Sequence, residues 1–181
     1  IILFSSIAAY GNQQPPFTED MPLQPVDLYG LQKANMEQMT KLMAECHGFE
    51  YIIFRPFNVY GPGQALNDPF RNVFGIWMNR IMSGESIQIY GDGSQKRAFS
   101  YIEDNLPCYI KALDCRPNQT FNIGSSQPNN LAHAAFLTIA AMGGDYNYDV
   151  ESLPDRHGEV KVAYCDVTKV RVALGFEEKT S

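Results

Sequence analysis

Two short apolar runs on either side of a long helical pattern constrain the fold more than any other feature of the sequence. Tyr51–Phe54 is continuously apolar, which is typical of a strand buried on both faces of a parallel sheet. Ile1–Ser5 is a similar run that ends in small hydroxyl residues. Residues 27–46 have a helical pattern, with Asp27 as a candidate N-cap and Gly48 just past the end. A strand, a helix and a second strand predict a doubly wound α/β sheet.

The second part of the chain has a mixed pattern. We expect further helices at residues 69–82, 103–113, 131–142 and 167–174. We expect further strands at residues 87–90, 100–102, 120–123 and 147–150. Residues 6–26 are expected to form a loop because prolines interrupt them. Asp104 is expected to cap the helix that starts at Glu103.

Composition excludes some partners. The 181 residues are 45% hydrophobic, enough for one sizeable core or for one domain and part of another. The net charge is −6 and no run of Lys or Arg occurs, which argues against nucleic acid as a partner. No apolar run is long enough to span a membrane.

The long helix carries an apolar stripe, for which core packing is the simplest interpretation; its members are Met36, Met39, Leu42 and Met43.

The four cysteines and three histidines lack metal-ligand spacing, so we predict no metal site. Cys46 and Cys108 lie in apolar helical patterns and are expected to be buried thiols. Free thiols fit a reducing, cytoplasmic environment best.

Tyr29 and Lys33 form a Tyr-x-x-x-Lys pair near the start of the long helix. Residues four apart lie on one helix face, so the phenol and the ammonium are neighbours. A cation beside a phenol favours the phenolate, which can take a proton from a hydroxyl while hydride leaves the same carbon. Alone, this pattern is a weak signal, because any helix can carry it by chance, and an exposed, solvated pair is its usual explanation. Glu37, one turn further on, is expected to pair with a nearby cation.

Other motifs accompany this pair in a definite order. They are Ser5-Ser6, Tyr10-Gly11, Arg55-Pro56-Phe57-Asn58-Val59-Tyr60-Gly61-Pro62, Gly91-Asp92-Gly93-x-Gln95-x-Arg97-x-Phe99, Phe121-Asn122-Ile123-Gly124 and Arg156-x-Gly158-Glu159. This ordered set resembles the nucleotide-sugar epimerase/dehydratase family of extended short-chain dehydrogenase/reductases, over nearly the whole chain. The resemblance implies that residues 1–62 are the C-terminal portion of an NAD-binding, Rossmann-like domain. It implies that residues 63–181 are mainly a small nucleotide-sugar-binding domain. Two segments of it, at about 115–125 and 90–104, are expected to cross back and join the last elements of the sheet.

The resemblance also implies NAD as cofactor, a UDP-sugar as substrate and a set of site residues. The implied catalytic residues are Ser6, Tyr29 as general base and Lys33. The implied cofactor-binding residues are Ser5, Tyr29, Lys33, Arg55, Pro56 and Phe57. The implied substrate-binding residues are Asn58, Asn72, Val73, Ile89, Arg97, Phe99, Arg156 and Ala163. From the residues alone, Ser6 is also explained as a strand-end cap, Asn58 as a turn residue and each arginine as a surface ion-pair partner.

The implied reaction is 4-epimerisation. Family dehydratases carry an acid and a base directly after the catalytic hydroxyl residue, whereas this chain has Ile7 and Ala8, which cannot move a proton. Reversible oxidation at C4 of the sugar is then the simplest chemistry. Ala163 stands where a large residue crowds the sugar in some epimerases, so a UDP-N-acetylhexosamine is a possible substrate as well as a UDP-hexose. A decarboxylase, a 4-keto reductase and a non-catalytic nucleotide-sugar-binding fragment are the alternatives.

One expected motif is absent. No glycine-rich dinucleotide fingerprint follows a strand, and in the family that fingerprint belongs to the first β-α-β unit. We therefore expect the chain to be a fragment of a family member, with an open sheet edge at Ile1–Ser5 and little activity alone. The resemblance implies that the complete protein is a homodimer, with the Tyr-Lys helix in its interface.

Overall fold

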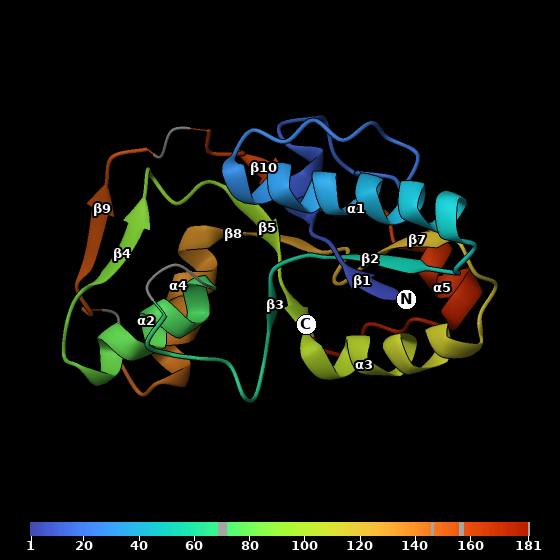
Figure 1. Ribbon diagram of the computed structural model, residues 1–181. Coiled ribbons are helices and arrows are strands. Elements are labelled where there is room, and N and C mark those ends of the chain that lie inside the picture. Colours follow the sequence, from blue (N-terminus) through green and yellow to red (C-terminus); the bar gives the residue numbers. More distant parts are fainter. Residues whose placement is uncertain (69–71, 146, 156–157, 181) are drawn as a thin grey trace.

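A three-stranded parallel sheet lies between two helices, to the right in Figure 1. The computed structural model describes residues 1–68, 72–145, 147–155 and 158–180. The sheet has the order β1 (Ile2–Phe4), β2 (Ile52–Pro56) and β7 (Gln119–Ile123), and its register aligns Phe4, Phe54 and Phe121. Helix α1 (Leu28–His47) covers one face, and α3 (Ile102–Lys111) covers the other (Figure 1). This arrangement confirms the predicted α/β class.

The two covered faces explain why β2 is apolar throughout. Ile52, Ile53 and Phe54 are all buried, because helices pack on both sides of this central strand. β1 is less enclosed: it pairs with β2 along one edge and with no described strand along the other. The Phe4 side chain is 45% exposed although its ring lies 4.9 Å from that of Tyr109 on α3.

Helix α1 begins and ends where its capping residues predict. The Asp27 carboxylate accepts a hydrogen bond from the Gly30 N–H at 2.6 Å, which satisfies a free donor of the first turn. Gly48 follows the last helical residue with φ +71°, and its N–H donates to the Ala44 carbonyl. A left-handed residue at this position favours glycine.

The second group of elements lies to the left in Figure 1. Helices α2 (Val73–Met82) and α4 (Leu131–Ala141) pack beside the parallel pair of β4 (Ile87–Tyr90) and β9 (Val150–Leu153). Its hydrophobic cluster surrounds Trp77, which is fully buried and donates its indole N–H to the Gln88 carbonyl at 2.9 Å.

Short strands connect the two groups, and two further helices complete the group around the sheet. β3 (Val59–Tyr60) pairs with β6 (Ser100–Tyr101), and β5 (Lys96–Ala98) lies between β8 (Pro128–Asn130) and β10 (Val162–Ala163). The 3₁₀ helix η2 (Ala112–Asp114) continues from α3, and α5 (Thr168–Leu174) packs against α3 and β7. No helix among the described residues is long and apolar enough to cross a membrane.

Several element boundaries differ from the predicted ones. Residues 7–10 form a 3₁₀ helix, η1 (Ile7–Tyr10), inside the segment predicted as loop. β9 begins at Val150, the last residue of its predicted range, where its register with β4 starts. α2 begins at Val73; the start predicted at Pro69 lies outside the described residues.

Three predictions about individual side chains were wrong. Asp104 caps no helix; it lies in the first turn of α3 and accepts hydrogen bonds from the backbone of Lys179 and Thr180. Cys46 is exposed because it lies on the outer face of α1, whereas Cys108 is buried as predicted. The apolar stripe on α1 is not core: Met39, Leu42 and Met43 are between 47% and 60% exposed. Their helix face points away from the sheet that α1 covers.

Candidate active site

The carboxyl end of β1 presents two serine side chains. Ser6 caps η1, and its Oγ accepts the Ala8 N–H at 3.2 Å, so it does act as a local cap. The Ser5 N–H donates to the Phe54 carbonyl at 2.7 Å, which continues the pairing of β1 with β2. The Ser5 Oγ is buried and has no hydrogen-bond partner among the described residues. A buried unpaired hydroxyl at a strand end is a possible ligand contact.

Tyr29 and Lys33 lie beside this strand end. The Lys33 Nζ donates to the Phe4 carbonyl at 2.8 Å and stands 5.7 Å from the centroid of the Tyr29 ring. Tyr29 is 54% exposed, so its phenol can reach a ligand. Gly30 allows this arrangement, because a Cβ at that position would collide with the Ala8 carbonyl of η1. The structure therefore brings the predicted catalytic residues onto adjoining elements.

Residues 55–58, at the end of β2 and just after it, present their backbone to the candidate site more than their side chains. Phe57 is buried, and its carbonyl accepts the Ser100 hydroxyl at 2.7 Å. Asn58 has φ +43° and donates its side-chain amide to the Ala98 carbonyl at 2.7 Å, which agrees with a turn residue and leaves its predicted substrate role untested. The Arg55 guanidinium is buried and bonded to Glu37, which confirms that Glu37 pairs with a cation. That the backbone of residues 55–57 contacts the cofactor is still a prediction.

The predicted substrate residues are divided between the second group of elements and the short strands that connect the two groups. Asn72 caps α2, accepts the Phe74 N–H and donates to the Val59 carbonyl and the Gln64 side chain. Phe99 packs against Phe74 with ring centroids 4.6 Å apart, while Ile89 is buried in the cluster around Trp77. These contacts account for Ile89 and Phe99 as packing residues and leave their predicted role near the nucleotide untested.

Arg97 is held in an ion pair. Its Nη2 lies 2.5 Å from the Glu159 carboxylate, and its Nη1 donates to the backbone carbonyls of Lys96 and Lys161. Burial lowers the pKa of the Arg97 guanidinium, and Glu159 opposes that change. Ala163 pairs with Arg97 in the sheet register and is buried. Arg156 lies outside the described residues.

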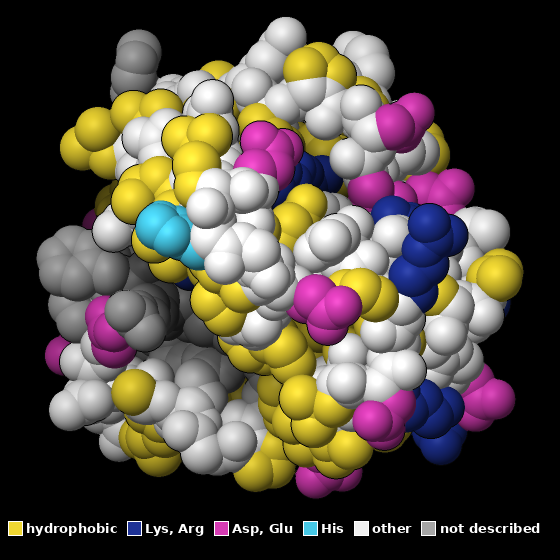
Figure 2. Space-filling view, turned by 45° about the vertical axis from the view of Figure 1, so that its right-hand side comes forward, with side chains coloured by type: hydrophobic (Ala, Val, Ile, Leu, Met, Phe, Trp, Pro, Cys, Tyr) yellow, Lys and Arg dark blue, Asp and Glu magenta, His cyan; other side chains and the backbone are white. Residues whose placement is uncertain are grey.

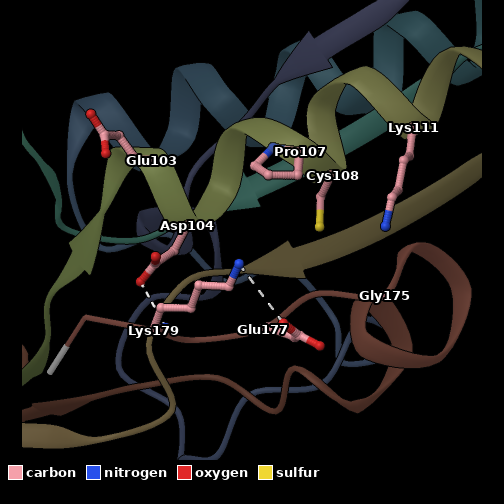
Figure 3. Close-up of a pocket in the computed structure, with 8 residues that line it drawn as sticks. All are labelled: Glu103, Asp104, Pro107, Cys108, Lys111, Gly175, Glu177 and Lys179. Atoms are coloured by element: carbon pink, nitrogen blue, oxygen red, sulfur yellow. Dashed lines mark hydrogen bonds and ion pairs between the residues drawn. The ribbon is translucent and has the colours of Figure 1, made fainter.

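A separate pocket lies between α3 and the C-terminal segment (Figure 3). Its lining residues are Glu103, Asp104, Pro107, Cys108, Lys111, Gly175, Glu177 and Lys179. It contains no predicted site residue; Lys111 donates to the Leu174 carbonyl, Lys179 pairs with Glu177, and Asp104 accepts from the backbone of Lys179 and Thr180. In the described part of the chain, no group of His, Cys, Asp and Glu is arranged to hold a metal ion.

Some polar residues near the site were not identified from the sequence. Tyr10 donates its hydroxyl proton to Asn122 at 2.7 Å and accepts from Arg55 at 2.6 Å. The Asn122 N–H donates to the Glu19 carboxylate at 2.8 Å. Tyr10 and Asn122 lie 112 residues apart in sequence, so only the motifs Tyr10-Gly11 and Phe121-Asn122-Ile123-Gly124 signalled them.

Comparisons with known proteins place this geometry in a family. The model of the NAD dependent epimerase/dehydratase family matches residues 1–124. A putative UDP-glucose 4-epimerase of Methanocaldococcus jannaschii is 33% identical over 97% of this chain and 57% of its own length. A UDP-N-acetyl-alpha-D-glucosaminuronate decarboxylase of Bacillus cytotoxicus is 29% identical over 98% of the chain and 52% of its own.

A solved structure agrees with these relatives. The UDP-glucose 4-epimerase of Thermotoga maritima, solved with UDP-glucose, superposes with a TM-score of 0.90 at 30% identity, over 99% of this chain and 58% of that one. The chain thus spans about half the length of the proteins it matches. The order of its motifs, its parallel sheet and the family match lead to one conclusion: the chain belongs to the NAD-dependent epimerase/dehydratase family of nucleotide-sugar enzymes.

Proposed function

We propose that the protein carrying this chain is a nucleotide-sugar 4-epimerase that uses NAD and acts on a UDP-hexose or UDP-N-acetylhexosamine. The observation that carries the proposal is the position of Tyr29 and Lys33. The phenol is exposed, the ammonium is bonded to the last carbonyl of β1, and Ser6 follows two residues later. Removing a proton from a sugar hydroxyl requires a base, a cation that stabilises the base and a hydroxyl that holds the sugar. Tyr29, Lys33 and Ser6 are such groups, and they lie at one strand end.

The residues present fit one end of NAD. The unpaired Ser5 hydroxyl, Tyr29 and Lys33 would hold the nicotinamide ribose, because they lie together at the carboxyl end of a parallel strand. The chain contains no glycine-rich motif for the pyrophosphate. NAD, when bound, supplies the acceptor and donor of the hydride at C4. We therefore expect little NAD-dependent turnover from the 181-residue chain alone.

Each proposed catalytic residue has a distinct task. Tyr29 takes the proton from the sugar O4, and the ammonium of Lys33 stabilises the phenolate. Ser6 hydrogen-bonds the sugar hydroxyl: its Oγ accepts the Ala8 N–H, which leaves its own O–H and a second lone pair for the sugar. Arg97 and Arg156 hold the diphosphate, with Asn72 as a further contact, so that the 4-keto sugar can turn over without leaving.

Epimerisation is favoured over related reactions by the residues after Ser6. Ile7 and Ala8 are the first two residues of η1, and their side chains offer no acid or base for dehydration. A decarboxylase is supported by the Bacillus cytotoxicus relative, but we identify no additional residues for a substrate carboxylate. A 4-keto reductase or a non-catalytic nucleotide-sugar-binding fragment would use the same binding residues.

We also propose that the complete protein is a cytoplasmic homodimer. Exposed apolar side chains on the outer face of α1, including Met39, Leu42 and Met43, support an interface there. Four free cysteines are compatible with a reducing compartment.

The test is an NMR assay of the native-length protein with NAD and, in turn, UDP-glucose and UDP-N-acetylglucosamine. We expect the 4-epimer to form and Tyr29→Phe to slow it by about 10²–10⁴-fold. Tyr51→Phe is the control, because the backbone of Tyr51 bonds to Asn118 while its hydroxyl bonds to none of the described residues. Release of CO₂ from a UDP-uronic acid would replace the proposal with decarboxylation. Binding of UDP-sugars without turnover would support the non-catalytic alternative.

A further inference from the structure

Arg55 is the centre of a buried polar network. Its Nε and Nη2 donate to the two carboxylate oxygens of Glu37 at 2.9 and 2.7 Å, a bidentate pair in which the two side chains are 2% and 1% exposed. Its Nη1 donates to the Tyr10 hydroxyl at 2.6 Å, and its guanidinium lies 4.8 Å from the centroid of the Tyr10 ring. Its Nη1 also donates to the Glu19 carbonyl at 3.3 Å, so every nitrogen of the guanidinium donates to a protein group.

The Glu37–Arg55 pair is the buried directional contact between α1 and the sheet. Two further contacts of α1 are the exposed bond from Lys33 to the Phe4 carbonyl and the close approach of Gly30 to the Ala8 carbonyl. The buried residues of α1 are Gly30, Glu37 and Ala44, spaced seven apart along one face. Gly30 and Ala44 permit close approach to the sheet, but such small side chains interlock weakly and resist sliding or rotation poorly. Glu37 is the one member of this buried face that makes directional bonds to another element, β2.

The network reaches the elements of all three proposed catalytic residues. Glu37 lies one turn after Lys33 and two turns after Tyr29 on the same helix. Tyr10 is the last residue of η1, the helix that Ser6 caps, and its hydroxyl bonds to Asn122 of β7. Arg55 on β2 therefore ties η1 and α1 to the central strands.

Stability alone is a poor explanation for such a pair. Desolvation of two buried charges offsets most of their attraction, and well-packed apolar residues of similar volume often serve equally well. We propose that Glu37 and Arg55 are positioning residues: their bidentate ion pair fixes the rotation and axial position of α1, so that Tyr29 and Lys33 lie beside Ser6. This inference rests on the proposed function and deepens it.

The test compares variants of the native-length protein in the epimerase assay and in thermal unfolding. Glu37→Met with Arg55→Met removes both charges and keeps side-chain volume, so we expect an unfolding midpoint equal to or above that of the wild type. We expect kcat to fall by about 10- to 100-fold, because the reacting groups lose their alignment. KM for the UDP-sugar should change by less than about twofold, because the proposed diphosphate ligands are not on α1.

The matched control is Glu177→Met with Lys179→Met, an exposed ion pair 3.9 Å apart, which should leave kcat, KM and unfolding unchanged. A stable Glu37/Arg55 double variant with wild-type kcat would overturn the proposal. If that variant does not fold, Arg55→Lys tests the positioning role instead, because lysine keeps the charge but cannot form the bidentate pair with Glu37. A lower kcat at constant KM supports positioning, and an unchanged kcat overturns it.

Absence of turnover in the wild type would refute the proposed function but not the inference. Hydrogen exchange of the amides of residues 28–33 needs neither substrate nor cofactor. Faster exchange in the double variant at equal global stability would support the positioning role. Wild-type protection of these amides would contradict it.

Discussion

At the scale of single residues, Glu19 shows how burial and hydrogen bonding compete. Partial burial raises the pKa of its carboxyl, while the hydrogen bond from the Asn122 N–H acts in the opposite direction. The raised pKa means that the folded state holds this proton to a higher pH than the unfolded state. The resulting stabilisation is present below the ordinary value of 4.5 and is lost as pH rises through the higher folded value.

Glu19→Gln tests this linkage. Relative to the variant, we expect the wild type to lose free energy of unfolding as pH rises from below 4.5 to above the folded-state pKa, measured by chemical denaturation. Asp20→Asn is the control with the opposite sign. Asp20 is exposed and its pKa is lowered by the hydrogen bond from Thr18, so its contribution is lost as pH falls. A pH-independent difference for Glu19→Gln would contradict the prediction.

Ala163 is the residue proposed to set substrate size. It is buried in the cluster that includes Ala98 and Cys165, so a large side chain there displaces neighbours as well as filling any space beside the sugar. In the native-length protein, we expect Ala163→Tyr to reduce kcat/KM for UDP-N-acetylglucosamine more than for UDP-glucose. The ratio is the readout, because general loss of folded protein lowers both values equally. Equal losses for the two sugars would refute the size-selection role.

At the scale of elements, α1 carries the proposed catalytic residues Tyr29 and Lys33, and its start is determined locally. The Asp27 carboxylate satisfies the Gly30 N–H in the first turn, directly next to Tyr29. We expect Asp27→Ala to lower the free energy of unfolding by about 1 kcal/mol in chemical denaturation. Asp27→Asn retains a capping oxygen and should cost only a few tenths of that. Similar losses for both variants would mean that the charge, rather than the hydrogen bond, stabilises the helix.

Local and long-range signals explain which elements were predictable. The ends of α1 lie within one residue of the predicted ones, because Asp27 and Gly48 are adjacent to the helix they cap. β5, β8 and β10 were not predicted, because each has two or three residues and exists only through pairing with the others. A strand of that length carries no recognisable periodicity of its own.

At the scale of the whole molecule, apolar surface remains uncovered. Hydrophobic side chains form continuous areas on the face shown in Figure 2. Near the outer edge of the sheet, Ile1 is 67% exposed, and on the adjoining α3 and η2 Ile110 and Leu113 are 67% and 72% exposed. β1 also has an edge that no described strand pairs. An open edge beside apolar side chains favours association.

We therefore expect the 181-residue chain on its own to self-associate in sedimentation velocity experiments. Ile110→Lys with Leu113→Lys should shift it toward the monomer, because charges oppose burial of this surface. Met82→Lys, a similarly exposed site on α2 in the other group of elements, should have no such effect. A wild-type chain that stays monomeric at high concentration would contradict the prediction.

The sequence by itself determined the α/β class, the principal helices and the order of the motifs, because periodicity, caps and motif spacing are local properties of the chain. Helix spacing paired Tyr29 with Lys33, and the resemblance of the ordered motifs to a known family added Ser6 and the catalytic role. The tertiary structure decided which groups they meet. Lys33 bonds to the Phe4 carbonyl, Glu37 meets Arg55, and Tyr10 meets Asn122 only after β1, β2 and β7 align. Partners this distant in sequence are selected by the geometry of the sheet and by the need to satisfy buried polar groups, which no local pattern encodes.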